Sequence, residues 1–275
     1  MPELPETETI ARDLDRALAE RKIVGVVVTR PDVLRGVGPR ALARRLTGAR
    51  IVRAWRRAKL IVLDLDSGDR LVVQPRFTGA LLIDDGTLAD GERLYSTLAL
   101  GLDDGRALHY RDIRRLGTVA VMSDARWRAY ESTLGVEPLD PAFTPPYLSA
   151  LFRGSGRAVK KVLMDQHRVA GVGNIYANEA LWRAGVDPSR AARTLSDAEG
   201  ARVHEGLVSV LREAIEARGT SFRDYRDASG SRGAFAGRLA VYGRGGEPCP
   251  RCGARLVDTS AVDGRTTVFC ARCQS

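Results

Sequence analysis

The feature that most constrains this chain is the arrangement of its four cysteines, all of which lie within residues 249–273. Cys249 and Cys252 are separated by two residues, as are Cys270 and Cys273, and seventeen residues lie between the two pairs. Two Cys-x2-Cys pairs at this spacing are typical of a ribbon that places four thiolates around one Zn²⁺. Because four thiolates leave no coordination position for water, we predict one structural zinc, which would stabilise a segment too short to build its own core.

The alternatives for the cysteines are free thiols or disulfides. The first residues, MPELPETETI, have no basic stretch followed by an apolar run, so we expect no signal peptide. No apolar run approaches the roughly 18 residues that would span a bilayer. These observations predict a cytoplasmic protein that does not bind membranes. In the reducing cytoplasm, clustered cysteines bind metal more often than they form disulfides.

The chain carries an excess of positive charge. It has 43 Lys and Arg against 34 Asp and Glu, a formal net charge of +9. Basic side chains that neutralise phosphates release counterions, so this excess favours a nucleic-acid partner. A solvated basic surface is the simpler alternative. With 275 residues, the chain is long enough for two domains with separate cores.

The first half of the chain has the pattern of an antiparallel β protein. We expect a helix over 7–20, where Ile10, Leu14 and Leu18 recur at intervals of four. Short apolar runs then predict strands at 23–30, 60–66, 70–74, 80–84, 94–100, 106–110 and 118–122. Turn residues separate several of these runs, which indicates an antiparallel sandwich or barrel.

The second half predicts helices followed by the zinc module. Ser196 and Glu199 have the spacing of a capping box at the start of the clearest helix. A loop rich in glycine and arginine follows at 219–238. The expected fold class is therefore α+β. The predicted domains are a β domain at 1–134, a proline-containing linker at 135–146, a helical domain at 147–237 and a zinc finger at 238–275.

The N-terminus offers an unusual candidate nucleophile. Pro2 is small enough for Met1 to be removed, which leaves a secondary amine on the first residue. An α-amino group has a pKa of roughly 8, so a fraction is neutral near pH 7 and can attack C1′ of a sugar to form an iminium. Glu3 and Glu6 could supply a general acid and orient it. From the residues alone, an ordinary capping segment before the first helix is the simpler alternative.

Two other segments could bind phosphate. The glycine-rich segment 169–182 lies between two helical stretches, and a glycine-rich turn that opens a helix directs backbone N–H groups and the helix dipole at an anion, to which Asn174 could add a side-chain donor. A plain helix–helix turn is the alternative. Lys59 follows two arginines and an alanine and opens an apolar strand, where a solvated lysine is the alternative to a phosphate contact.

Several motifs, in order along nearly the whole chain, resemble formamidopyrimidine-DNA glycosylase and the related endonuclease VIII. They are PELPE at 2–6, RRAK at 56–59, DIRRLG at 112–117, VAGVGNIYANEAL at 169–181, VYGRGGEPCPRCG at 241–253 and GRTTVFCARCQ at 264–274. The resemblance implies a β-sandwich flanked by helices, then a helix–two-turn–helix and a zinc finger. It also implies a monomer that binds damaged double-stranded DNA and needs no small-molecule cofactor.

The resemblance implies a role for each matching residue. Pro2 would be the nucleophile and Schiff-base former, and Glu3 the general acid and base, with Glu6 supporting it. The phosphates flanking the lesion would be held by Lys59, Asn174 and Arg265, and Tyr242 is a further implied DNA contact. Lys59 and Arg265 are also counted as part of the catalytic site. The four cysteines would hold the zinc.

A base excised from a duplex must first be flipped out, and the gap it leaves must be filled. The family fills this gap with a Met, an Arg and a Phe, where this chain has Phe77, Arg114 and Leu116. Only the arginine matches, but both replacements are apolar, so intercalation is expected to survive with an altered preference for the opposite base. Gln74 stands where the family often has His, which removes one possible cation near the DNA.

The resemblance therefore implies a bifunctional DNA glycosylase and AP lyase of base excision repair. The loop at 219–238 resembles the one that caps 8-oxoguanine, which favours 8-oxoguanine and formamidopyrimidines as lesions. The expected reaction passes through a Schiff base on Pro2 and ends in β,δ-elimination. Alternatives are an endonuclease VIII-like enzyme for oxidised pyrimidines, a non-catalytic lesion-binding protein and a zinc-ribbon RNA-binding protein.

Overall fold

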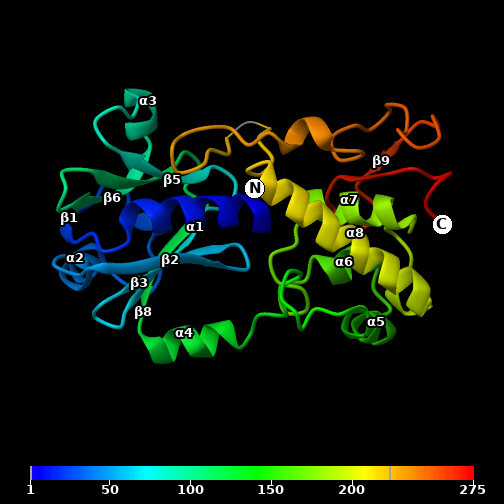
Figure 1. The fold of residues 1–275 in the computed structure, drawn as a ribbon, viewed down its shortest axis with the longest axis horizontal. Helices are drawn as coiled ribbons and strands as arrows, with labels where there is room; N and C mark the ends of the chain where they lie inside the picture. The colour runs from blue at the N-terminus through cyan, green and yellow to red at the C-terminus, as the bar shows by residue number, and fades with distance from the viewer. Residues whose placement is uncertain (1, 223) are drawn as a thin grey trace. The chain divides into compact units, whose positions relative to one another are not determined.

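The computed structural model describes residues 2–222 and 224–275, which group into two compact units (Figure 1). The first unit contains the residues up to Ser132 together with Ala217–Ala236, and the second contains Thr133–Glu216 and Gly237–Ser275. The loop before the zinc finger was predicted to belong to the helical domain. Its contacts group it with the β unit, because it bonds to the first helix. The predicted limits of the linker and the zinc finger stay predictions.

The first unit is built on two four-stranded antiparallel sheets, with strand orders β1-β6-β7-β5 and β2-β3-β4-β8. The strands are β1 (Ile23–Val28), β2 (Ile51–Arg57), β3 (Leu60–Leu65), β4 (Arg70–Gln74), β5 (Gly79–Asp84), β6 (Ser96–Leu102), β7 (Ala107–Asp112) and β8 (Thr118–Met122). Alternate residues of β3, Ile61 and Leu63, share one buried apolar cluster with Leu81 and Leu108 of the other sheet. The predicted α+β class with an N-terminal antiparallel sandwich is confirmed.

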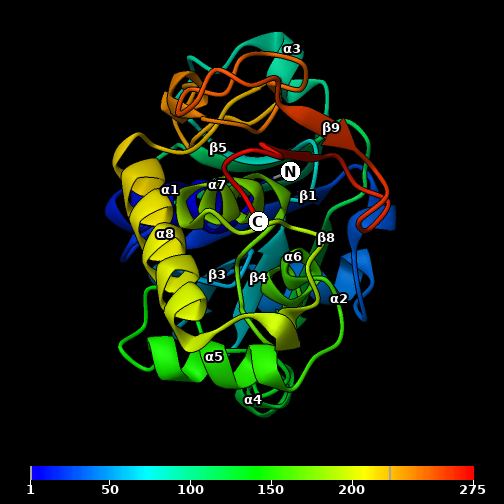
Figure 2. The same cartoon turned by 90° about the vertical axis from the view of Figure 1, so that its right-hand side faces the viewer.

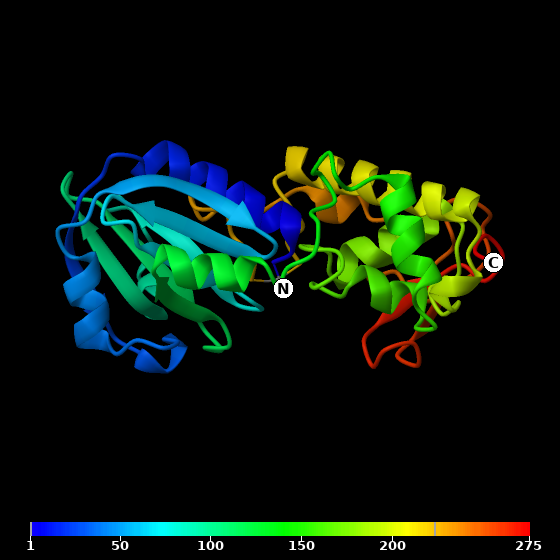
Figure 3. The same ribbon diagram turned by 90° about the horizontal axis from the view of Figure 1, so that it is seen from below.

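Helices flank these sheets. They are α1 (Leu4–Leu18), α2 (Pro39–Leu46), α3 (Asp90–Arg93) and α4 (Asp124–Glu131), with a 3-10 turn at Pro31–Val33. The buried face of α1 carries Ile10, Leu14 and Leu18, as predicted, but the helix begins three residues earlier because a capping box closes its first turn. The helix lies along β2 (Figure 3), where Asp15 accepts a hydrogen bond from the backbone N–H of Ala54 at 2.8 Å.

The second unit is helical and ends in a small hairpin. Its elements are α5 (Pro145–Arg153), α6 (Val159–Leu163), α7 (Asn174–Ala184), a 3-10 turn at Ala192–Thr194, α8 (Asp197–Glu216), β9 (Val257–Thr259) and β10 (Thr267–Phe269); a further 3-10 turn, Phe235–Arg238, straddles the boundary of the units. The helices α7 and α8 pack together (Figure 2), and a Cβ on Gly206 would lie 2.9 Å from the carbonyl oxygen of Ala180. The predicted capping box is confirmed, since Glu199 N–H donates to Ser196 and Ser196 N–H donates to Glu199.

Among the described helices, none combines the length and the apolar character needed to cross a membrane.

Candidate active site and DNA-binding residues

The start of α1 holds the candidate catalytic carboxylates. Glu3 is the N-cap residue, and its side chain accepts a hydrogen bond from the backbone N–H of Glu6. The Glu6 carboxylate in turn accepts from the backbone N–H of Glu3 at 2.8 Å. Both side chains are almost fully buried, with exposed fractions of 2% and 1%, and Pro2 is also buried. The capping segment considered as an alternative is therefore present, and it fixes two buried carboxylates immediately after Pro2.

Glu6 also anchors the loop Ala217–Ala236. Its second oxygen, Oε1, accepts a hydrogen bond from the backbone N–H of Thr220 at 2.8 Å. Gly219 has a φ of +85°, and a Cβ there would lie 2.9 Å from Cγ of Glu6, so a side chain would be both strained and crowded. Tyr225 donates its hydroxyl to the carbonyl oxygen of Glu6 at 3.4 Å, and burial raises the pKa of Tyr225. The loop expected to cap the lesion is thus attached to a candidate catalytic carboxylate.

Lys59 lies in the turn between β2 and β3 and is only 8% exposed. Arg56 ties this turn to α1, because its Nε donates to the Glu8 carboxylate at 2.7 Å and its Nη1 donates to the carbonyl oxygen of Ala58 at 3.1 Å. Burial would raise the pKa of Glu8, but Arg56 and Arg12 together hold that pKa below its ordinary value. Lys59 is therefore not a solvated lysine, and its contact with a phosphate stays a prediction.

Phe77, Arg114 and Leu116, which we call the wedge side chains, extend from two turns of the first unit. One turn joins β4 to β5, the other joins β7 to β8, and β5 pairs with β7. Phe77 and Leu116 are 49% and 41% exposed, and Cζ of Arg114 lies 5.4 Å from the centre of the Phe77 ring. Exposed apolar side chains beside an arginine are suited to insertion into a base stack. Gln74 ends β4, where it pairs with Thr118 and is half-buried.

Asn174 opens α7 after a glycine N-cap, as the glycine-rich turn predicts. Its side-chain Nδ2 donates to the carbonyl oxygen of Thr266 at 2.9 Å. This bond reaches the segment next to Arg265, which is exposed. The second unit therefore brings Asn174 and Arg265 into one region, although they are far apart in the sequence.

Two buried charged residues that the sequence analysis missed support the same region. Lys160 is fully buried, and its Nζ donates to Oγ1 of Thr267 at 2.7 Å. Glu179 is also fully buried, and its carboxylate accepts hydrogen bonds from three successive backbone N–H groups that end at Tyr242. The backbone of Tyr242 is thereby fixed to α7. The scarcity of lysine in this chain was the only sequence signal for Lys160, and nothing local marked Glu179.

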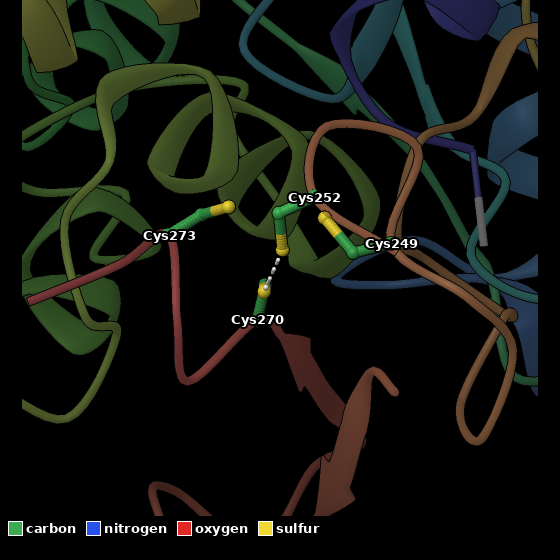
Figure 4. Close-up of side chains that lie close together, drawn as sticks. All are labelled: Cys249, Cys252, Cys270 and Cys273. Carbon is green, nitrogen blue, oxygen red and sulfur yellow. Dashed lines mark hydrogen bonds between the residues drawn. The ribbon is translucent and has the colours of Figure 1, made fainter. Parts of the chain in front are cut away.

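The four cysteines meet at the base of the hairpin formed by β9 and β10 (Figure 4). Their sulfur atoms all lie within 4.8 Å of one another, and the sulfurs of Cys252 and Cys270 are 3.5 Å apart. Tetrahedral zinc with Zn–S bonds of about 2.3 Å needs sulfurs roughly 3.8 Å apart, so the set fits Zn²⁺. Cys249 and Cys270 are buried in a small apolar cluster with Val241, Leu256 and Val268, and because so small a cluster is a weak core, a bound metal would be a major support of this module. The predicted structural zinc site is confirmed.

Three known domain families match the chain in succession. The N-terminal domain of formamidopyrimidine-DNA glycosylase matches residues 1–119, and the helix–two-turn–helix domain of the same enzyme matches residues 134–226. A zinc finger found in this glycosylase and in isoleucyl-tRNA synthetase matches residues 246–275.

Individual relatives are similar over the whole chain. A formamidopyrimidine-DNA glycosylase of Thermomicrobium roseum is 42% identical and covers 100% of this chain and 99% of its own length. The crystal structure of MutM (Fpg) from Thermus thermophilus is 38% identical, with a TM-score of 0.87 and coverage of 99% and 98%. A mutant Fpg of Lactococcus lactis, solved with DNA that contains Fapy-dG, is 32% identical, with a TM-score of 0.92 and full coverage of both chains.

Proposed function

The chain belongs to the formamidopyrimidine-DNA glycosylase family, which makes it a DNA glycosylase of base excision repair with AP lyase activity, and we propose that the amine of Pro2 is its nucleophile. The observation that carries this proposal is the buried carboxylate of Glu3 directly after Pro2, paired with buried Glu6 in the capping box of α1. Glu6 accepts hydrogen bonds from two backbone N–H groups, so it positions the helix start and the loop. Glu3 is the residue we assign to proton transfer.

In the proposed reaction, the nitrogen of Pro2 attacks C1′ of the damaged nucleotide. The bond from C1′ to the base breaks, and the base leaves with the electron pair and takes up a proton. Glu3 protonates the ring oxygen as the sugar opens, the amine loses its proton, and an iminium forms. The iminium acidifies the C2′ hydrogens, so loss of one proton expels the 3′ phosphate by β-elimination. A δ-elimination then expels the 5′ phosphate.

The partner is damaged double-stranded DNA, and the contacts follow from the family roles. We assign phosphate binding to Lys59, Asn174 and Arg265, with Tyr242 as a further contact. The net charge of +9 supports this assignment. The zinc, held by four thiolates, supplies structural support to the hairpin and takes no part in the chemistry. We propose that the enzyme acts as a monomer in the cytoplasm.

We propose oxidised purines, 8-oxoguanine and formamidopyrimidines, as the lesions. The attachment of the loop Ala217–Ala236 to Glu6 supports this, since a loop that caps the flipped base is then coupled to the reacting centre. The similar Lactococcus lactis protein was solved with Fapy-dG DNA. Oxidised pyrimidines are the second candidate, because a Lactococcus lactis Fpg was also solved with DNA containing an oxidised pyrimidine.

The experiment that tests this function is borohydride trapping of the full chain, shown by mass spectrometry to begin at Pro2. Three duplexes are compared, carrying 8-oxoguanine opposite cytosine, thymine glycol opposite adenine, or an abasic site. We expect a covalent adduct with all three, forming fastest with 8-oxoguanine among the two base lesions.

An adduct with thymine glycol but not with 8-oxoguanine would move the substrate to oxidised pyrimidines while keeping the amine mechanism. An adduct confined to the abasic site would contradict the proposed base specificity. If no duplex gave an adduct, the amine mechanism itself would be overturned.

Replacing a wedge side chain should change how the enzyme discriminates between cytosine and adenine opposite the lesion. Leu116→Phe replaces an exposed aliphatic side chain with an aromatic ring. Stacking of a base on an aromatic ring stabilises a complex with DNA by on the order of 1–3 kcal/mol. We expect the ratio of excision rates for 8-oxoguanine opposite cytosine and opposite adenine to change by about tenfold in single-turnover assays. Ile113→Phe, in the same turn and also exposed, is the matched control and should leave the ratio unchanged. Equal ratios in both variants would remove Leu116 from the wedge.

A further inference from the structure

We propose that Asp112 and Thr78 form a buried clasp that holds the two wedge turns, residues 75–78 and 113–116, in fixed register. The wedge side chains would then enter the DNA as one preformed unit instead of being ordered on binding. This inference rests on the proposed function, because it assigns positioning residues to the step that replaces the flipped base.

The clasp centres on the carboxylate of Asp112, the last residue of β7, which is 1% exposed. Its Oδ1 accepts a hydrogen bond from the hydroxyl of Thr78 at 2.5 Å. Its Oδ2 accepts from the backbone N–H of Gly117 at 2.8 Å and from the hydroxyl of Tyr110 at 3.2 Å. One buried carboxylate thus binds Thr78 at the end of the first wedge turn and Gly117 directly after the second.

Thr78 connects the two turns directly. Its hydroxyl donates to Asp112 and accepts from the backbone N–H of Arg114 at 2.9 Å, so one oxygen bridges the first turn to the backbone of a wedge residue in the second. The strand pairing of Gly79 with Asp112 sets the register in which this bridge forms. Thr78 is 4% exposed, so water does not compete for these bonds.

The backbone beneath the wedge is also tightly constrained. Arg76 and Arg115 each have a φ of +52°, an uncommon conformation for residues with side chains, and each directly precedes the apolar wedge residue of its turn. A Cβ on Gly117 would lie 1.9 Å from the hydroxyl oxygen of Tyr110. Strained turns of this kind persist only where surrounding bonds fix them, and the clasp supplies those bonds.

The clasp is needed because the wedge side chains receive little support from packing. Phe77 and Leu116 are apolar yet more than 40% exposed, and Arg114 is exposed as well. Ordering such turns on binding would oppose insertion through lost conformational entropy. A preformed wedge avoids that cost when the base is flipped.

Thr78→Val tests the inference. The valine is nearly isosteric but lacks the hydroxyl, so it leaves Oδ1 of Asp112 and N–H of Arg114 without their shared partner. Thr78→Ser restores the hydroxyl and is the rescue variant. Thr97→Val is the matched control, because Thr97 is also a buried threonine, 1% exposed, and its hydroxyl donates to the backbone oxygen of Tyr110 in β7 and not to Asp112 or to either wedge turn.

Three readouts are compared. The first is single-turnover excision of 8-oxoguanine from a duplex, and the second is stopped-flow fluorescence of 2-aminopurine beside the lesion, which reports insertion. The third is borohydride trapping on a single-stranded abasic oligonucleotide, where no base stack has to be entered. For Thr78→Val we expect the first two rates to fall about tenfold, with trapping on the single strand unchanged. Thr78→Ser and Thr97→Val should resemble the unmodified protein in all three.

If Thr78→Val and Thr97→Val lowered the duplex rates equally, the effect would be one of general stability and the clasp would be refuted. Unchanged duplex rates in Thr78→Val would refute it as well. If the unmodified protein trapped neither this single strand nor an abasic duplex, the result would instead contradict the Pro2 mechanism, so the two failures can be told apart.

Discussion

Replacing Pro2 with glycine is expected to lower the single-turnover rate of base excision and of strand cleavage by at least about a hundredfold. Glycine at the second position still permits removal of Met1 and still leaves an α-amine. That amine is primary and sits on a freely rotating residue, so it loses the fixed direction that the proline ring gives the nucleophile. The measurement is excision of 8-oxoguanine and the yield of borohydride adduct, each with enzyme in excess over DNA.

Pro5→Gly is the matched control for this experiment. Pro5 is a buried proline in the first turn of α1, and its replacement should weaken the helix start by about 1 kcal/mol without touching the terminal amine. We expect a lower melting temperature with adduct formation retained. Near-normal turnover in Pro2→Gly would remove Pro2 from the mechanism, whereas equal losses in both variants would point to the helix start instead of the amine.

Replacing Cys270 with serine is expected to release the zinc and to weaken binding to damaged and undamaged duplexes alike. The site loses one of four thiolates, and metal binding supplies on the order of 10 kcal/mol or more to modules of this kind. Without the metal, the hairpin that carries Arg265 loses a major support. We expect DNA affinity to fall by about a hundredfold, through lost phosphate contacts.

The measurement combines metal analysis of the purified protein with fluorescence anisotropy on the two duplexes at a fixed salt concentration. Ala271→Ser is the control, because it adds the same hydroxyl at an exposed neighbouring position and keeps all four thiolates. It should retain one zinc per chain and normal affinity. Full zinc occupancy in Cys270→Ser would contradict the four-cysteine site.

Elements with strong local periodicity were predictable from the sequence. The runs that became β3, β4 and β8 were recognised because they are continuous apolar segments between turns. The strand β2 (Ile51–Arg57) was missed, because two exposed residues separate its buried Ile51 and Ala54 and the pattern does not alternate. The helix α2 (Pro39–Leu46) was missed for a similar reason, since only Leu42 and Leu46 are buried in a short, arginine-rich segment.

Some functional residues were likewise predictable from the sequence, and others were not. The cysteine pairs are defined by their spacing in the sequence, so the zinc site could be inferred before any fold was known, whereas the roles of Pro2 and Asn174 were implied only by the resemblance to a known family. The hydrogen-bond partners of buried polar residues could not be inferred in this way. Thr78 bonds to a partner 34 residues away, and Lys160 to one 107 residues away. The residues that neighbour Thr78 and Lys160 in the sequence do not indicate these partners.

The sequence by itself therefore determined the zinc site and the class of fold, because each depends on spacing or periodicity along a short stretch of chain, and its family motifs pointed to Pro2 as the candidate nucleophile. Only the tertiary structure decided that Glu6 anchors the loop at Thr220, that Glu179 fixes the segment ending at Tyr242, and that Asp112 joins the two wedge turns. The physical reason is that a buried polar group must find a hydrogen-bond partner wherever the fold brings one, and that partner is set by strand register and helix packing, which local sequence does not encode.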